Sequence, residues 1–119
     1  MGKVEEGLIF LDDALAAIDQ TGERHYEAEV NRLKGELLLV QDPSSDVVEN
    51  LFHRALAVAR QQSARSWELR AALSLARLWH NQGKKQEAYG VLFGVYDWFS
   101  EGLDTSDLQE ARFLLQELA

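Results

Sequence analysis

The sequence contains no cysteine and a single proline, Pro43. Without cysteine, the 119-residue chain can form no disulfide, no thiolate metal site and no cysteine nucleophile, which fits a reducing cytosol. With one proline, long uninterrupted helices are permitted almost everywhere. No apolar run approaches the roughly 20 residues of a membrane-spanning helix, and residues 1–6 lack the pattern of a signal peptide. These absences predict a cytoplasmic protein that does not enter a membrane.

The charges fall into three blocks along the chain. The net charge is −8, and residues 51–85 are strongly basic whereas both flanking segments are acidic. Charge runs are usually solvated or paired locally, so neutralisation between neighbouring helices is one interpretation. The alternative is a basic face that binds an acidic partner. Its candidate residues are Arg54, Arg60, Arg70 and Arg77.

Apolar residues recur at helical spacing throughout, and no alternating strand pattern is present. The pattern predicts an all-α chain with an apolar stripe along each helix. The expected helices cover about residues 3–20, 23–41, 46–63, 65–82, 84–100 and 106–118. In the second helix, the stripe expected to face inward is Tyr26, Val30, Leu33, Leu37 and Val40. The stripes expected in three later helices are Val48, Leu51, Phe52, Ala55, Leu56 and Ala59 in the third, Leu69, Ala72, Leu73, Ala76 and Trp79 in the fourth, and Leu108, Ala111, Leu115 and Leu118 in the sixth.

Helix ends are also marked in the sequence. Gly83 is suited to the position after a helix C-terminus. Capping-box spacing links Asp46 with Glu49 and Ser106 with Gln109, each at the start of a predicted helix. The turns between helices are short, so consecutive helices are expected to pack antiparallel.

A period of 40–41 residues relates the predicted helices to one another. The odd-numbered helices share a pattern that includes Val48 and Ala88, and the aligned pairs of the even-numbered helices are Gly35 with Ala76 and Trp67 with Leu108. Small side chains at Gly35 and Ala76 would let a partner helix approach closely. A fixed period across the chain is typical of a solenoid. The prediction is one domain over residues 1–119, a right-handed stack of antiparallel helical hairpins.

Part of this period resembles a known repeat. Leu75-Ala76-x2-Trp79-x3-Gly83-x4-Ala88-x3-Leu92 resembles a tetratricopeptide repeat, with a large-small pair, an aromatic residue, a turn glycine, an alanine and a bulky residue. The roughly 34-residue period of that repeat is lengthened here, with the added residues in the hairpin linkers. The resemblance implies a tetratricopeptide-like fold and a role in binding.

A longer resemblance covers nearly the whole chain. Its most specific part is the segment Tyr96-x-Trp98-Phe99-x-Glu101-Gly102-x-Asp104-Thr105-x-Asp107-Leu108. The chain is similar to the C-terminal repeats of large bacterial signalling ATPases, many of which resemble class III adenylate or guanylate cyclases fused to an AAA/STAND-type ATPase. The catalytic and nucleotide-binding motifs of such proteins have no counterpart in this sequence. The resemblance therefore implies a regulatory fragment of a larger protein.

Motifs for catalysis or cofactor binding are missing. There is no GxxxxGK[ST] or GxGxxG loop. Glu49 and His53 stand four residues apart on one predicted helix, which is too few ligands for a metal site. The arginines of residues 51–85 could contact phosphates, but the net charge of −8 argues against nucleic acid. We expect no enzymatic activity, no metal and no cofactor.

Two glycines form a GxxxG pair in the fifth predicted helix. The simplest interpretation of Gly90 and Gly94 is close approach to the sixth helix, and the alternative is the wall of a groove.

The favoured function is a scaffold that binds a protein or peptide. The alternative is a sensor that holds a small ligand in the concave groove. A pocket with convergent polar groups between the even-numbered helices would favour the sensor, and a broad shallow surface would favour the scaffold. The first helix carries apolar residues off its main stripe, which predicts a homodimer through Leu8, Ile9 and Phe10.

Overall fold

The computed structural model describes residues 2–21, 26–42, 46–99 and 105–119. Within these ranges 88% of the residues are helical and no strand is present. The helices are α1 (Gly2–Thr21), α2 (Glu27–Gln41), α3 (Asp46–Gln61), α4 (Arg65–Asn81), α5 (Lys85–Tyr96) and α6 (Ser106–Leu118). The prediction of an all-α chain is confirmed for this part of the sequence.

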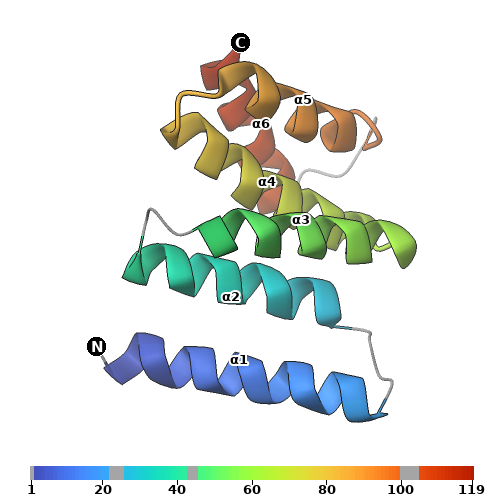
Figure 1. Cartoon of the computed structure of the whole chain (residues 1–119). Helices are drawn as coiled ribbons and strands as arrows, with labels where there is room; N and C mark the ends of the chain where they lie inside the picture. The colour runs from blue at the N-terminus through green and yellow to red at the C-terminus, as the bar shows by residue number, and fades with distance from the viewer. Residues whose placement is uncertain (1, 22–25, 43–45, 100–104) are drawn as a thin grey trace.

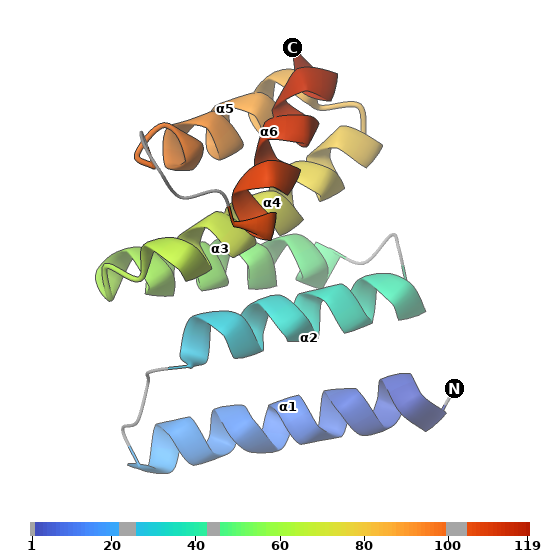
Figure 2. The same cartoon turned by 180° about the vertical axis from the view of Figure 1, so that it is seen from behind.

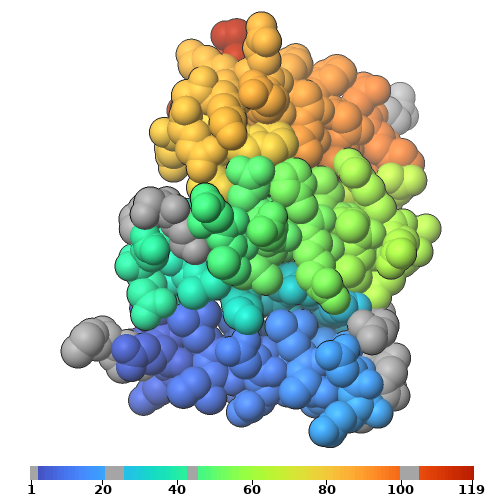
Figure 3. Space-filling model, viewed as in Figure 1, coloured from blue at the N-terminus to red at the C-terminus, as the bar shows by residue number. Residues whose placement is uncertain are grey.

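The helices form an elongated stack that measures 39 × 30 × 20 Å. From α1 to α5 the helices run alternately in opposite directions, and α6 crosses α4 (Figures 1 and 2). Each helix packs on the next in sequence, and α4 also contacts both α2 and α6. Among the described residues, α1 contacts α2 alone. The space-filling view shows α1 as the outermost layer at the N-terminal end (Figure 3).

Two connections share one backbone geometry. After α3, Ser63 has a φ of 55°, and after α4, Gly83 has a φ of 80°. In the first turn the Ala64 N–H donates to the carbonyl of Ala59 at 2.9 Å, and in the second the Lys84 N–H donates to the carbonyl of Trp79 at 2.8 Å. Both are Schellman motifs, which satisfy carbonyls that a helix end leaves unpaired. The predicted role of Gly83 is confirmed, and Ser63 adopts the same left-handed conformation without being glycine.

Two predicted helix ends are wrong. The fifth helix was expected to reach residue 100, but α5 ends at Tyr96. Beyond it the Trp98 and Phe99 amides donate to carbonyls three residues back, a tighter turn that closes the helix. At the start of α6 the cap is Thr105 and not Ser106, because the Thr105 hydroxyl accepts from the Leu108 N–H at 3.3 Å. Asp46, predicted to cap the third helix, is the first residue of α3 itself. The expected start of the second helix, at residue 23, lies outside the described residues.

The hydrophobic core lies in α3 to α6. Val48 and Phe52 of α3 and Leu92 of α5 have no exposed surface. The core cluster also includes most of the stripe expected on α4, together with Leu108, Ala111, Leu115 and Leu118 of α6. The apolar stripes predicted for α3, α4 and α6 are therefore confirmed.

The stripe predicted for α2 is wrong at three positions. Tyr26, Leu33 and Val40 are 62%, 39% and 71% exposed. The buried residues of α2 are instead Glu27, Ala28, Asn31 and Gly35. Three helices, α1, α3 and α4, contact α2. Because helices that pack this closely leave little room between them, small residues are buried on α2 and the large residues of the predicted stripe are not.

Gly35 shows how close that approach is. A Cβ atom at Gly35 would lie 2.6 Å from Cε1 of Phe52, which is fully buried in α3. The prediction that Gly35 faces a partner helix is confirmed, and its equivalent Ala76 is also completely buried.

Burial changes the alignment of α6 with α4. Leu69 and Ala72 of α4 are 2% and 0% exposed, and Leu108 and Ala111 of α6 are 3% and 0% exposed. Trp67, which the sequence aligned with Leu108, is only partly buried. The buried positions of α6 therefore follow those of α4 after 39 residues, and not after 41.

Candidate functional site

A row of alternating charges crosses the even-numbered helices. Arg70 of α4 donates through Nη1 to Glu29 of α2 at 2.9 Å and through Nε to Asp107 of α6 at 3.0 Å. Arg32 of α2 donates through Nε and Nη2 to the two carboxylate oxygens of Glu29, at 2.8 and 2.9 Å. Paired contacts of this kind fix geometry as well as adding stability. We call this side of α2, α4 and α6 the even-helix surface; its charged residues are Glu29, Arg32, Arg70, Arg77, Asp107 and Glu110.

These contacts shift the pKa values of the groups that make them. Burial raises the pKa of Glu29, but hydrogen bonds and charges from Arg32 and Arg70 lower it by more, so the net pKa lies below its ordinary value. The hydrogen bond to Glu29 raises the pKa of Arg32. Hydrogen bonds to Asp107 and then to Glu29 raise the pKa of Arg70. Glu29 and the two arginines thus favour one another's charged forms across the carboxylate–guanidinium contacts, as in a structural network of ion pairs.

The four arginines predicted to form a basic face are divided between two helices. Arg70 and Arg77 lie on α4, on the even-helix surface. Arg54 and Arg60 lie on α3, and each reaches a glutamate near the start of an even-numbered helix. The ion pairs are Arg54–Glu27 at 3.6 Å, Arg60–Glu68 at 3.0 Å and Arg77–Glu110 at 2.5 Å. All four arginines therefore pair with carboxylates of this chain, as neutralisation between neighbouring helices implies. Binding of an acidic partner stays a prediction.

The burial of Glu27 and Glu68 was not predicted from the sequence. They lie 41 residues apart and are 5% and 4% exposed. Each follows an aromatic residue, Tyr26 or Trp67, and these two rings lie 5.4 Å apart. The recurrence of an aromatic-glutamate pair at the repeat period is a signal that could have revealed them.

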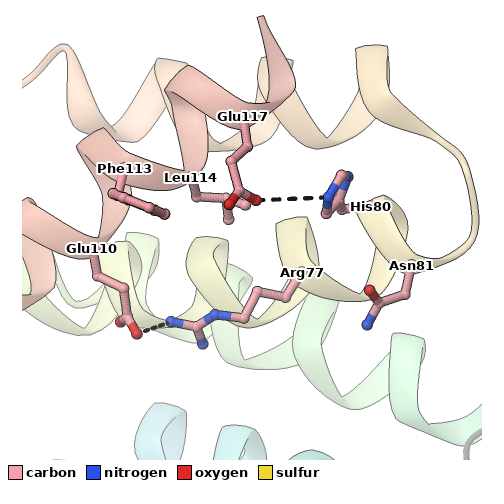
Figure 4. Close-up of a pocket in the computed structure, with 7 residues that line it drawn as sticks. All are labelled: Arg77, His80, Asn81, Glu110, Phe113, Leu114 and Glu117. Carbon is pink, nitrogen blue, oxygen red and sulfur yellow. Dashed lines mark ion pairs between the residues drawn. The ribbon is translucent and has the colours of Figure 1, made fainter.

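A hollow of about 260 Å³ opens between α4 and α6. Figure 4 shows its α4 side and its α6 side facing each other across the opening. At one end Arg77 pairs with Glu110, and at the other His80 Nε2 lies 3.8 Å from Glu117 Oε2. Phe113 is 66% exposed. The lining of this α4–α6 hollow is Arg77, His80, Asn81, Glu110, Phe113, Leu114 and Glu117.

The α6 side of this hollow was not predicted from the sequence. Phe113 falls off the predicted stripe of Leu108, Ala111, Leu115 and Leu118, so an exposed aromatic residue could have been expected on the opposite face. The contacts across the hollow join residues 33 and 37 positions apart, Arg77 with Glu110 and His80 with Glu117, and no local sequence pattern predicts them.

A second hollow, of about 300 Å³, lies between the N-terminal ends of the same helices. Trp67, Phe99 and Asp107 are among its lining residues. Small-molecule sites typically measure roughly 300–1,000 Å³, so both hollows are at or below the small end of that range.

The residues predicted for self-association are not equivalent. Ile9 and Phe10 are 61% and 72% exposed, whereas Leu8 is partly buried.

A second exposed face lies on α5. Among the described residues, no atom outside the local helix backbone comes within 4 Å of a Cβ built at Gly90 or Gly94, so the predicted close approach of these glycines to α6 is wrong.

The described residues contain no group of three or more His, Asp or Glu side chains that could hold a metal ion. None of the described helices is long and apolar enough to cross a membrane.

No known protein family, curated protein or solved structure matches the chain. The resemblance to tetratricopeptide repeats and to the repeat regions of bacterial signalling ATPases therefore stays a prediction.

Proposed function

We propose that the chain is a protein-interaction scaffold that binds a peptide segment of another protein on the even-helix surface. The observation that carries the proposal is the α4–α6 hollow, which combines an exposed aromatic ring, Phe113, with charged and amide groups on an open surface. Exposed aromatic residues beside polar groups are typical of binding surfaces.

The arrangement of the helices supports a tetratricopeptide-like stack for this scaffold. The even-numbered helices contact one another through α4, whereas α1, α3 and α5 make no backbone contact with each other among the described residues. Fully buried side chains recur at matched positions, as at Phe52 and Leu92, 40 residues apart. In such a stack, the layer of even-numbered helices would provide the continuous surface on which a partner binds.

The dimensions of the hollows favour the scaffold over the small-ligand sensor. An open space of about 260 Å³ accommodates one or two side chains of a peptide. The polar groups around it are spread along the surface and do not converge on one point, and Arg77 and Glu110 already pair across α4 and α6.

The chain would serve as the regulatory repeat region of a larger bacterial signalling protein. This part of the proposal depends on the resemblance of residues 96–108 and of the segments before them. It is tested by the parent protein's activity, which should change when the partner peptide binds.

A homodimer through α1 is a separate proposal. Ile9 and Phe10 are the large exposed apolar side chains of α1. Glu6 and Asp13 lie on the same face, so charge would oppose a contact between two α1 helices. The two-fold dimer would instead place the acidic α1 of one copy against the basic residues 51–85 of the other. Sedimentation equilibrium at micromolar concentration should show a dimer that Phe10→Glu dissociates. A monomer of 13.5 kDa would exclude self-association.

The test of the scaffold uses a random peptide library displayed on phage and selected against the purified chain. We expect peptides whose binding is weakened at least tenfold by Phe113→Ala, about 1.4 kcal/mol. The matched control is Phe93→Ala, which removes another exposed ring, on α5 and outside the hollow. If every selected peptide binds equally to both variants and to the unaltered chain, the even-helix surface is not the binding site.

A further inference from the structure

Among the described residues, one carboxylate of the α4–α6 hollow has no lysine or arginine partner. Glu110 is paired with Arg77 at 2.5 Å. Glu117, whose side chain is 51% exposed, is paired in the described structure only with His80, at 3.8 Å, a distance that exceeds a hydrogen bond. Glu117 is therefore the carboxylate of the hollow that a further cation can approach.

His80 stands beside Glu117 without bonding to it. Its Nδ1 atom is buried and has no hydrogen-bond partner among the described residues. Its Nε2 atom lies 3.8 Å from the Glu117 carboxylate, so a closer cationic group can still approach that carboxylate from the open side of the hollow.

The apolar side of the hollow lies next to this carboxylate. Phe113 and Leu114 belong to the same helix as Glu117 and line the same opening (Figure 4). A lysine or arginine side chain combines an aliphatic stem with a cationic end. Its stem would cover Leu114, and its charged end would lie between the Glu117 carboxylate and the face of the Phe113 ring, an arrangement that cations favour.

We propose that the partner is a basic peptide segment, and that one of its lysine or arginine side chains occupies the α4–α6 hollow beside Glu117 and Phe113. This inference rests on the proposed function, because it names the chemistry of the segment that the scaffold binds. The chain's net charge of −8 adds to it, since an acidic protein attracts basic segments and accelerates their association.

The experiment compares three fluorescently labelled synthetic peptides of equal length. They share the same leucine and alanine positions and carry lysine, glutamine or glutamate at the remaining ones. Binding is measured by fluorescence anisotropy against the unaltered chain. We expect the lysine peptide to bind tightest and the glutamate peptide weakest, and we expect added salt to reduce the difference.

Two matched variants locate the contact. Glu117→Gln should weaken the lysine peptide roughly three- to tenfold, in line with a partly exposed ion pair next to an apolar surface. Glu87→Gln removes the same charge from an exposed position on α5 and should change the affinity less than twofold. Both variants change surface residues, so circular dichroism should show that each one folds.

The outcomes separate this inference from the proposed function. If the glutamine or glutamate peptide binds as tightly as the lysine peptide and Phe113→Ala weakens it, the scaffold stands and the basic partner is wrong. Equal losses of affinity for the lysine peptide in Glu117→Gln and Glu87→Gln would also overturn the inference. The attraction would then come from the overall negative charge of the chain and not from Glu117. If Phe113→Ala weakens the binding of none of these peptides and of no library peptide, the proposed function is wrong as well. A dimer that Phe113→Ala dissociates would show that a second copy of the chain occupies the hollow.

Discussion

The two ends of this molecule are built from similar helices but are held together differently. In α3 to α6 the core is continuous and apolar, with Phe52 and Leu92 fully buried. At the other end α1 buries only Leu11 and Ile18 to a comparable degree, at 6% and 9% exposure. The difference shows that apolar spacing along a helix does not by itself decide how much of the helix is buried. The number of neighbouring helices decides it, and α1 contacts only one in the described structure.

Ion pairs supplement the apolar contacts at the α1–α2 end. Lys34 of α2 pairs with Asp12 of α1 at 2.6 Å. Glu29 of α2 pairs with Arg70 of α4 at 2.9 Å, which links this end to the apolar core. Exposed ion pairs contribute little, so stability should be concentrated in α3 to α6.

The two regions should differ most in the loss of stability that follows when one aromatic ring is removed from each. Phe52→Ala should lower the free energy of unfolding by about 3–5 kcal/mol, because it leaves a cavity in a fully buried site. Phe10→Ala should change it by less than about 0.5 kcal/mol, because the ring is 72% exposed. Urea unfolding followed by circular dichroism measures both.

Phe52→Leu serves as a milder variant where Phe52→Ala leaves too little folded protein to measure. Similar losses for the α1 and α3 substitutions in the monomeric protein would show that α1 is as well packed as α3.

A second comparison adds a methyl group to a helical glycine in each region. Gly35→Ala should lose about 1–3 kcal/mol, because the new Cβ would lie 2.6 Å from the immobile ring of Phe52. At Gly7 the nearest atom is Cδ1 of Leu37 at 2.8 Å, the flexible end of a partly buried side chain. Gly7→Ala should therefore retain up to about 1 kcal/mol of the helix-propensity gain of alanine.

Chemical denaturation of the two glycine variants under identical conditions decides between these outcomes. A loss at Gly7 as large as that at Gly35 would mean that α1 and α2 are packed as rigidly as α2 and α3.

The ion pair between Glu29 of α2 and Arg70 of α4, which links the two regions, predicts that the free energy of unfolding depends on pH. Because the pKa of folded Glu29 lies below its ordinary value of 4.5, its contribution is fully present above that value and is lost as the pH falls through the folded pKa. At neutral pH Glu29→Gln should cost on the order of 1–2 kcal/mol. Unfolding measured from pH 7 downward should show the variant and the unaltered chain converging below pH 4.5.

Glu87→Gln is the control for the acid series, since Glu87 is exposed on α5. If Glu29→Gln and the unaltered chain lose stability in parallel through the acid range, the contacts of Glu29 with Arg32 and Arg70 do not stabilise the fold.

The smallest effect concerns the two matching turns that connect the helices of the packed region. Gly83→Ala should lose roughly 1 kcal/mol, because alanine is strained at a φ of 80°. Ser63→Gly should gain up to about 1 kcal/mol by relieving the same strain at a φ of 55°. Thermal unfolding should therefore shift in opposite directions, and shifts of the same sign would show that the turns are not equivalent.

How much could be predicted from the sequence varied from helix to helix. The apolar stripe of α3 was predicted correctly because large residues recur there at regular spacing and one face is buried. The stripe of α2 was wrong because Val40 and Leu33 follow helical spacing but face solvent, while Asn31 and Gly35 occupy the buried face. Local spacing carries no information on how many sides of a helix are covered.

The candidate site was less predictable than the fold. The sequence located an excess of arginine between residues 51 and 85, but it could not show that Arg70 lies between Glu29 and Asp107. Those carboxylates are 41 and 37 residues away along the chain, and any of the many acidic side chains could have been the partner.

The sequence by itself determined the helical character of the described chain, the left-handed turn at Gly83 and the positions of most core residues in α3 to α6, because these depend on local propensity and periodicity. Only the tertiary structure decided which face of α2 is buried, which carboxylate each arginine pairs with, and that Phe113 and Glu117 share a hollow with His80. These features depend on contacts between helices, whose geometry is set by close packing across the whole stack and not by any one segment.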